Sequence, residues 1–147
     1  MMPLLANRLL IVEDDRNALA GLQELLREEG FFVRGVTDGC RALDAVARET
    51  FDIVLCDYCL PGMDGLQLCG ELRRSQPHLT FFLVTAYRNP ELVHAAGQLG
   101  IAKVLSKPII LAELLETLTT AAARIRGGPD YREQPEVDLR MTEAIFL

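Results

Sequence analysis

Two overlapping patterns in residues 56–65 could each carry chemistry. Cys56 and Cys59 have the C-x-x-C spacing of a thiol redox or zinc site. Asp57, between them, follows the mostly apolar run of residues 51–55, where a buried strand is expected to end. The chemistry of this stretch therefore belongs either to the two sulfurs or to the carboxylate.

The neighbouring residues argue against the sulfurs. A redox C-x-x-C motif places its first thiol at a helix N-terminus, where the helix dipole lowers the thiol pKa. Here the charge of Asp57 opposes that effect, and the turn at residues 60–62 separates the cysteines from any following helix. Zinc would need further ligands, yet four candidates stand alone without chelating spacing: Cys40, Cys69, His78 and His94. We expect Cys56 and Cys59 to be packing and loop residues.

A second group of carboxylates follows the first apolar run of the chain. Glu13, Asp14 and Asp15 come directly after residues 8–12. Asp15 is best explained as the cap of the next helix. Glu13 and Asp14 are better explained by a cation if Asp57 lies beside them, because two carboxylates about 4 Å apart repel by about 4 kcal/mol at an effective dielectric near 20. Such an oxygen-rich site suits Mg²⁺.

The rest of the chain predicts the elements that hold these residues. Short, mostly apolar runs alternate with helical patterns, and the runs are residues 8–12, 31–36, 51–56, 79–84 and 101–105. Each run is followed by a helical pattern, and the last of these fades by residue 126. This alternation predicts an α/β fold with a parallel sheet covered by helices on both faces.

In sheets of this kind ligands bind at the carboxyl ends of the strands. The residues expected there are Glu13, Asp14, Asp57, Thr85 and Lys107. Lys107 supplies a cation beside the acids, and the Thr85 hydroxyl can donate a hydrogen bond to a bound oxyanion. One rim of the sheet should therefore combine carboxylates, a lysine and a hydroxyl.

Composition limits the remaining possibilities. The chain has 147 residues and a formal net charge of −6, which predicts one acidic domain and argues against binding to nucleic acid or to anionic lipid. We expect no membrane span, no signal peptide, reduced thiols and a cytoplasmic location. The amino-acid composition changes at Gly127-Gly128-Pro129. We therefore predict a domain over residues 6–126 and a linker or C-terminal tail over residues 127–147.

Four motifs in order resemble the response-regulator receiver domain of two-component signalling. They are residues 10–15 (LIVEDD), residues 57–65 (DYCLPGMDG), Val84-Thr85-Ala86 and Lys107-Pro108. The resemblance covers about residues 6–126. It implies a doubly wound, flavodoxin-like (βα)5 parallel sheet with strand order 2-1-3-4-5, and a signalling protein that is an enzyme only in its own phosphorylation and dephosphorylation.

The resemblance also implies a role for each rim residue. Asp57 matches the phosphoacceptor, which takes a phosphoryl group from a histidine kinase or phosphotransfer protein. Glu13, Asp14, Asp57 and the backbone carbonyl of Cys59 match the Mg²⁺ ligands. Thr85 and Lys107 match the residues that bind phosphoryl oxygens. The signalling surface is expected on the fourth helix, fifth strand and fifth helix, where a downstream protein or a homodimer partner could bind.

The chain departs from the family pattern beside the lysine. The family usually has an aromatic switch residue three positions before it, and this chain has Val104 there. Tyr87, two residues after Thr85, is a candidate to gate the rim instead. The side chains of Cys59 and Tyr87 should flank the path of a hydrolytic water, which predicts an atypical phosphoryl lifetime.

Other interpretations remain open at this point. The same sheet could hold FMN, although the acidic rim lacks a phosphate-binding loop. A haloacid-dehalogenase-type phosphatase would need an aspartate where Cys59 stands. A receiver fold that signals without phosphate, or the C-x-x-C thiol protein, are further alternatives. No DNA-binding or enzymatic output domain fits in residues 127–147, so output would come from a partner or from a missing domain.

Overall fold

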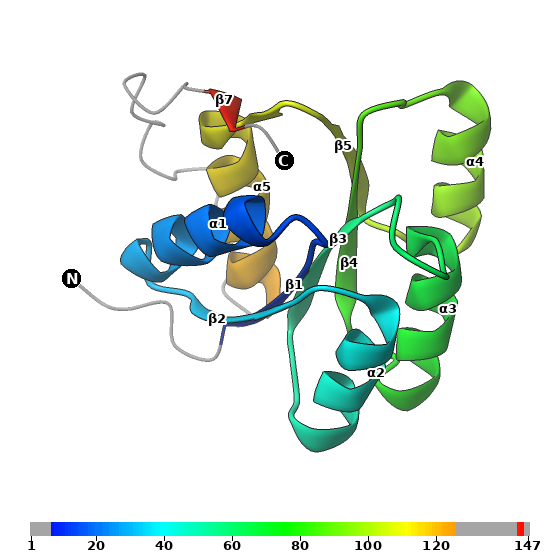
Figure 1. Cartoon of the computed structure of the whole chain (residues 1–147), viewed down its shortest axis with the longest axis horizontal. Helices are drawn as coiled ribbons and strands as arrows, with labels where there is room; N and C mark the ends of the chain where they lie inside the picture. The colour runs from blue at the N-terminus through cyan, green and yellow to red at the C-terminus, as the bar shows by residue number, and fades with distance from the viewer. Residues whose placement is uncertain (1–6, 126–143, 146–147) are drawn as a thin grey trace.

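The computed structural model describes residues 7–125 and 144–145, and shows a parallel sheet with helices on both faces (Figure 1). Its strands are β1 (Arg8–Val12), β2 (Phe32–Val36), β3 (Ile53–Asp57), β4 (Thr80–Thr85) and β5 (Lys103–Ser106). Its helices are α1 (Arg16–Glu28), α2 (Gly39–Arg48), α3 (Gly65–Ser75), α4 (Pro90–Gln98) and α5 (Leu111–Ile125). A separate two-stranded sheet joins β6 (Ile109–Ile110) to β7 (Ala144–Ile145).

The strand order of the main sheet is β2-β1-β3-β4-β5, and every neighbouring pair in it is parallel. Strand β1 pairs with β2 and β3 in a register that sets Val12 opposite both Val36 and Cys56. The carboxyl ends of the strands therefore reach one rim together. This confirms the predicted flavodoxin-like (βα)5 sheet with strand order 2-1-3-4-5.

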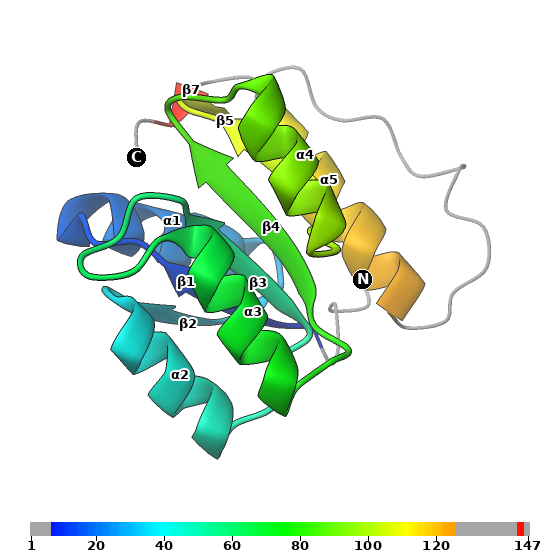
Figure 2. The ribbon, with the colours of Figure 1, turned by 90° about the vertical axis from the view of Figure 1, so that its right-hand side faces the viewer.

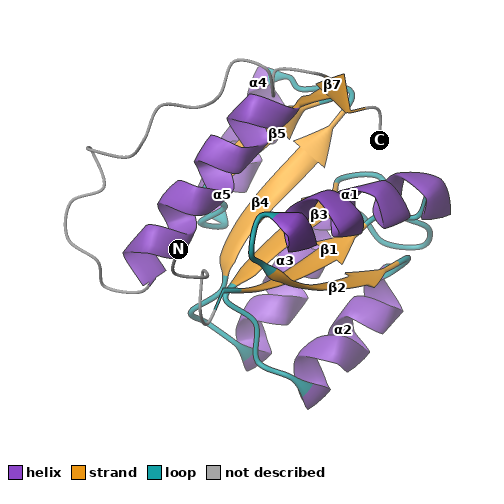
Figure 3. Cartoon of the chain, turned by 90° about the vertical axis from the view of Figure 1, so that its left-hand side faces the viewer, coloured by secondary structure: helices purple, strands orange, loops and turns teal. Residues whose placement is uncertain are grey.

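Successive residues of the buried strands feed two separate cores. In β3 the side chains of Ile53 and Leu55 join the core under α1 and α5, whereas Val54 and Cys56 join the core under α2, α3 and α4. Figure 2 shows α2, α3 and α4 in front of the sheet, and Figure 3 shows α1 on the opposite side. Burial on both faces explains why β3 reads as an unbroken apolar run.

The helix boundaries follow from local chemistry. Asp15, Asp38, Asp64 and Asn89 are the N-caps of the first four helices, and each accepts a hydrogen bond from a backbone N–H of the first turn. Gly100 has φ +77°, a left-handed conformation that suits glycine just after the end of α4. These caps place each helix start next to the rim of the sheet.

Some predicted boundaries were wrong by one or two residues. The third strand begins at Ile53 instead of residue 51 and includes Asp57 as its last residue. The fifth strand begins at Lys103 instead of residue 101, because the N–H of Ile101 donates to the carbonyl of Ala96 and closes α4 (3.0 Å).

Two further expectations concern the domain boundary and membrane spans. The predicted boundary at residues 126–127 lies outside the described residues. Within the described ranges, no helix is both long enough and apolar enough to cross a membrane.

Candidate functional site at the sheet rim

The structure places the predicted rim residues at the ends of four strands. Asp57 and Thr85 are the last residues of β3 and β4, and Lys107 follows β5 by one residue. Glu13 follows β1, and its N–H donates to the carbonyl of Val36 in β2 (3.1 Å). Because β1, β3, β4 and β5 are consecutive in the sheet, residues far apart in the sequence form one site.

Lys107 joins two of the acids. Its Nζ donates to Oδ2 of Asp57 at 2.8 Å and lies 3.6 Å from Oε1 of Glu13. The Lys107 side chain is 14% exposed, and those of Asp57 and Glu13 are 8% and 3% exposed. Burial lowers the pKa of Lys107, but the hydrogen bond and charge of Asp57, with the charge of Glu13, outweigh this and raise its pKa. One ammonium group thus faces two buried carboxylates.

The acids also form a candidate cation site. Glu13, Asp14 and Asp57 each offer a carboxylate oxygen, and these oxygens lie within 4.8 Å of one another. Asp14 is exposed, so the group opens to solvent on one side. Oε1 of Glu13 is buried and has no hydrogen-bond donor. Carboxylates that converge in this way fit a hard divalent cation such as Mg²⁺.

Glu13 is the acid most affected by this environment. Burial, the largest cause, raises the pKa of Glu13 to about 7. The charge of Asp57 also contributes to this raised pKa, whereas the N–H of Asp15, which donates to Oε2 (3.0 Å), and the charge of Lys107 lower it. Burial therefore disfavours the charged form of Glu13, which a bound cation would stabilise.

Backbone hydrogen bonds hold the rim residues in register. The carbonyl of Thr85 accepts the N–H of Lys107 at 2.9 Å, and the carbonyl of Val84 accepts the N–H of Tyr58 at 2.8 Å. The N–H of Cys59 points to Oδ1 of Asp57 at 3.4 Å. The loop after β3 therefore presents its backbone to the Asp57 carboxylate.

The residues that depart from the family pattern lie in different environments. Tyr87 is 78% exposed, while its N–H donates to Oγ1 of Thr85 at 3.1 Å. Val104 is buried in the core under α2, α3 and α4. Cys59 is exposed in the loop after β3. Tyr87 is thus linked to the rim through the backbone, and its ring is open to solvent.

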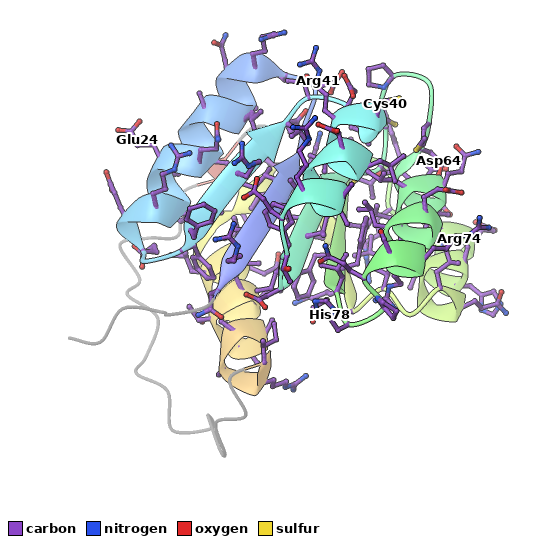
Figure 4. The ribbon with its side chains drawn as sticks, turned by 90° about the horizontal axis from the view of Figure 1, so that it is seen from below. Glu24, Cys40, Arg41, Asp64, Arg74 and His78 are labelled. Atoms are coloured by element: carbon purple, nitrogen blue, oxygen red, sulfur yellow. The ribbon has the colours of Figure 1, made fainter. Side chains whose placement is uncertain are left out.

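The structure also separates the sulfurs by environment. Cys56 is buried, its Sγ donates to the carbonyl of Asp57 (3.1 Å), and burial raises its thiol pKa well above the usual value. Cys40 lies at the start of α2 and His78 near the opposite end of the sheet (Figure 4). Nε2 of His78 contacts the carbonyl of Phe51. Among residues 7–125, Glu13, Asp14 and Asp57 are the one group of three or more potential metal ligands that converge.

Comparison with known proteins agrees with this fold and site. The family model described as the response regulator receiver domain matches residues 9–119. The chain belongs to this family, whose members act in two-component signalling, have histidine kinases as partners, and are not enzymes beyond their own phosphorylation. The FMN, phosphatase and thiol interpretations are set aside by this membership.

Individual relatives extend the comparison. The sensory transduction protein RegX3 of Mycobacterium tuberculosis is 39% identical over 128 residues, which are 86% of this chain and 55% of that protein. A CheY-like receiver domain protein of Methanospirillum hungatei has a TM-score of 0.78 at 26% identity, over 82% of this chain and 97% of that one. The response regulator TrrA of Thermotoga maritima, solved in complex with Mg²⁺ and BeF, has a TM-score of 0.70 at 28% identity, over 78% of this chain and 98% of that one.

The curated relatives are longer than the matched region. The chain spans 55% of the length of RegX3 and 17% of the length of the sensory/regulatory protein RpfC of Xanthomonas campestris. The comparison therefore establishes the receiver domain and not the activity of a whole protein.

Proposed function

We propose that this receiver domain accepts a phosphoryl group on Asp57 from the phosphohistidine of a kinase or phosphotransfer protein. In this step an Asp57 carboxylate oxygen forms a bond to phosphorus, the bond from phosphorus to the histidine nitrogen breaks, and the nitrogen keeps the electron pair. The observation that supports it best is the position of Asp57, which lies between Lys107 and two further acids at the end of the central sheet. Phosphoryl transfer depends mainly on positioning and charge neutralisation.

Four groups would hold Mg²⁺ at this rim. They are the carboxylates of Glu13, Asp14 and Asp57 and the backbone carbonyl of Cys59, so the Cys59 side chain is free to vary. The buried Oε1 of Glu13, which lacks a donor, supports the fit. Mg²⁺ would supply charge that offsets the repulsion between a carboxylate nucleophile and an incoming phosphate.

Lys107 and Thr85 would bind the transferred group. Lys107 already lies within hydrogen-bond distance of Asp57, and its ammonium would pair with a phosphoryl oxygen. The Thr85 hydroxyl oxygen accepts the N–H of Tyr87, which leaves its own O–H available to donate to a second phosphoryl oxygen. The new group would add nearly two negative charges to the rim.

The signal would leave through α4, β5 and α5. Drawing Thr85 and Lys107 toward the phosphoryl group would move the ends of β4 and β5, which changes the surface offered to a downstream protein or to a second copy. The usual aromatic switch is replaced by Val104, and Tyr87 is proposed to gate the rim and the lifetime of the acyl phosphate. We place this activity in the cytoplasm, within a domain of residues 6–126.

A titration with beryllofluoride tests the proposal. The probe is a stable mimic of the phosphoryl group, added with Mg²⁺ while amide spectra of the protein are recorded. We expect shifts at Thr85 and Lys107 in the wild type and in Asp44→Asn, because Asp44 is an exposed acid of α2 that pairs with Arg48. Asp57→Asn should show none. Absence of shifts in the wild type would favour a receiver fold that signals without phosphate.

A further inference from the structure

A short segment near the end of the chain pairs with the loop that follows Lys107. β7 is antiparallel to β6, with Ile145 opposite Ile109 and Ala144 opposite Ile110. β6 follows β5 in the chain, and β7 lies near the carboxyl ends of the strands (Figure 2). No sequence pattern predicted this pairing, because two residues are too few to show a period.

The pairing partner of β7 is connected directly to the phosphoryl-binding site. β6 begins two residues after Lys107, whose N–H donates to the carbonyl of Thr85 and whose Nζ donates to Asp57. Ile109 is 1% exposed and packs in the core with α5. In the segment from Lys107 to Ile110, the first residue therefore contacts Asp57 at the rim, and the last two residues pair with β7.

The number of residues between α5 and β7 is large enough for β7 to reach β6. A helix of the length of α5, 15 residues, spans about 22 Å. The eighteen residues numbered 126–143 can span at most about 60 Å when extended. Residues 144–145 can therefore reach β6 with chain length to spare, so the pairing does not need to strain the connection.

A ladder of two residue pairs is weak by itself. Isolated two-stranded sheets are marginally stable in water, so the position of β6 decides whether β7 stays paired. Small movements of the Lys107–Ile110 backbone are then enough to change the fraction of molecules in which β7 is bound.

We propose that Ala144–Ile145 is a docked strand whose pairing with β6 is coupled to the phosphoryl group on Asp57. The coupling, but not the pairing, rests on the function proposed above. In the structure Lys107 contacts the free carboxylate of Asp57. A phosphoryl group adds atoms at that position, so the ammonium must change its position to pair with a phosphoryl oxygen instead of the free carboxylate. The following backbone moves with it, and the pairing with β7 weakens.

Thermodynamic linkage also determines how the pairing of β7 affects binding at Asp57. If the phosphoryl group weakens the pairing, then loss of the pairing must strengthen binding of a phosphoryl mimic by the same factor. The carboxyl-terminal segment would thus hold the domain toward its unphosphorylated state and be released on phosphorylation.

Hydrogen exchange of the β6 amides tests the pairing without any ligand. The variant Ala144→Pro/Ile145→Pro removes both N–H donors of β7, so it breaks the ladder whichever of the two pairs is hydrogen-bonded. We expect faster exchange at Ile109 or Ile110 in this variant. The control Asp138→Pro places proline at a position other than residues 144–145, and it should exchange like the wild type. Equal exchange in all three proteins would overturn the proposal.

Beryllofluoride with Mg²⁺ tests the coupling. We expect it to accelerate exchange at the same β6 amides in the wild type, and to bind several-fold more tightly to the double proline variant than to Asp138→Pro. Binding that shifts Thr85 but leaves β6 exchange and affinity unchanged would overturn the coupling while the proposed function stands. Failure to bind at all would overturn both, and the ligand-free comparison would still decide the pairing.

Discussion

Nζ of Lys107 lies 2.8 Å from Oδ2 of Asp57 and 3.6 Å from Oε1 of Glu13, so one cation is shared by two buried carboxylates. The three residues come from the ends of β5, β3 and β1. The chain has only one other lysine, Lys103, which is half exposed at the start of β5. The pair of lysines therefore offers a matched comparison.

Loss of Lys107 should destabilise the protein in the absence of metal. Lys107→Met leaves two buried carboxylates without their cation, and we expect it to cost about 1 to 3 kcal/mol, between the values for exposed and buried ion pairs. Urea denaturation at pH 8 measures this free energy of unfolding. Lys103→Met should cost less, and added Mg²⁺ should narrow the difference. Equal losses in the two variants would contradict the shared-cation role.

The raised pKa of Glu13 predicts an unusual pH dependence of stability. Because its pKa is about 7 in the folded protein and about 4.5 when unfolded, the native state binds more protons between these values. The Glu13 contribution to the free energy of unfolding therefore falls as pH rises from about 4.5 to 7, by a total of about 3 kcal/mol.

Denaturation of the metal-free protein between pH 5 and 8 measures this effect. Glu13→Gln cannot ionise, so the wild type should lose stability relative to it as pH rises through this range. Mg²⁺ should restore the wild type at pH 8, where Glu13 is ionised. Parallel pH profiles of the two proteins would show that Glu13 titrates as an ordinary glutamate.

Two glycines of α3 should respond oppositely to alanine. A Cβ on Gly65 would lie 2.5 Å from Cδ1 of Leu83 and 3.0 Å from the carbonyl oxygen of Asp57. Gly65→Ala should therefore destabilise by about 1 to 3 kcal/mol and weaken binding of beryllofluoride, since it displaces the loop beside Asp57. At Gly70 no atom lies within 4 Å of the Cβ position, so Gly70→Ala should stabilise by up to about 1 kcal/mol. Thermal denaturation measures the change in stability, and the beryllofluoride titration measures the change in binding. Equal behaviour of the two variants would contradict this prediction.

Tyr87 should affect the lifetime of the acyl phosphate. Its backbone contacts Thr85 while its ring is largely exposed, so Tyr87→Ala should leave the fold intact and open the path of water to the rim. We expect dephosphorylation to become several-fold faster, measured as loss of the phosphoprotein over time. Tyr87→Phe is the control, because it keeps the aromatic ring. Tyr58→Ala would not serve, because Tyr58 packs against the core. Unchanged rates in Tyr87→Ala would remove Tyr87 from the site.

Much of this architecture could be predicted because periodicity and strand-end chemistry are local properties. The unbroken apolar run at β3 and the caps Asp38, Asp64 and Asn89 carry their structural meaning in the sequence. The rule for parallel sheets then brings Asp57 and Glu13 to one rim. The raised pKa of Glu13 and the shared contact with Lys107 depend on burial and side-chain direction, which no spacing encodes.

The pairing of β6 with β7 could not be predicted for a different reason. Ala144 and Ile145 have no periodic neighbours, and their partner lies more than thirty residues away in the sequence. The first residue of the fifth strand was also misjudged, since Ile101 is apolar enough for a strand but its N–H belongs to the end of α4. In both cases tertiary contacts outweigh local propensity.

The intact mass of the protein after incubation with Mg²⁺ and acetyl phosphate tests the central claim most directly. We predict a gain of one phosphoryl group that is labile to hydroxylamine, as expected for an acyl phosphate on Asp57. The adduct should form in Cys59→Ser and Asp44→Asn, and be absent in Asp57→Asn. An adduct that persists in Asp57→Asn would contradict the assignment of Asp57 as the phosphoacceptor and return the chemistry to another group of the rim.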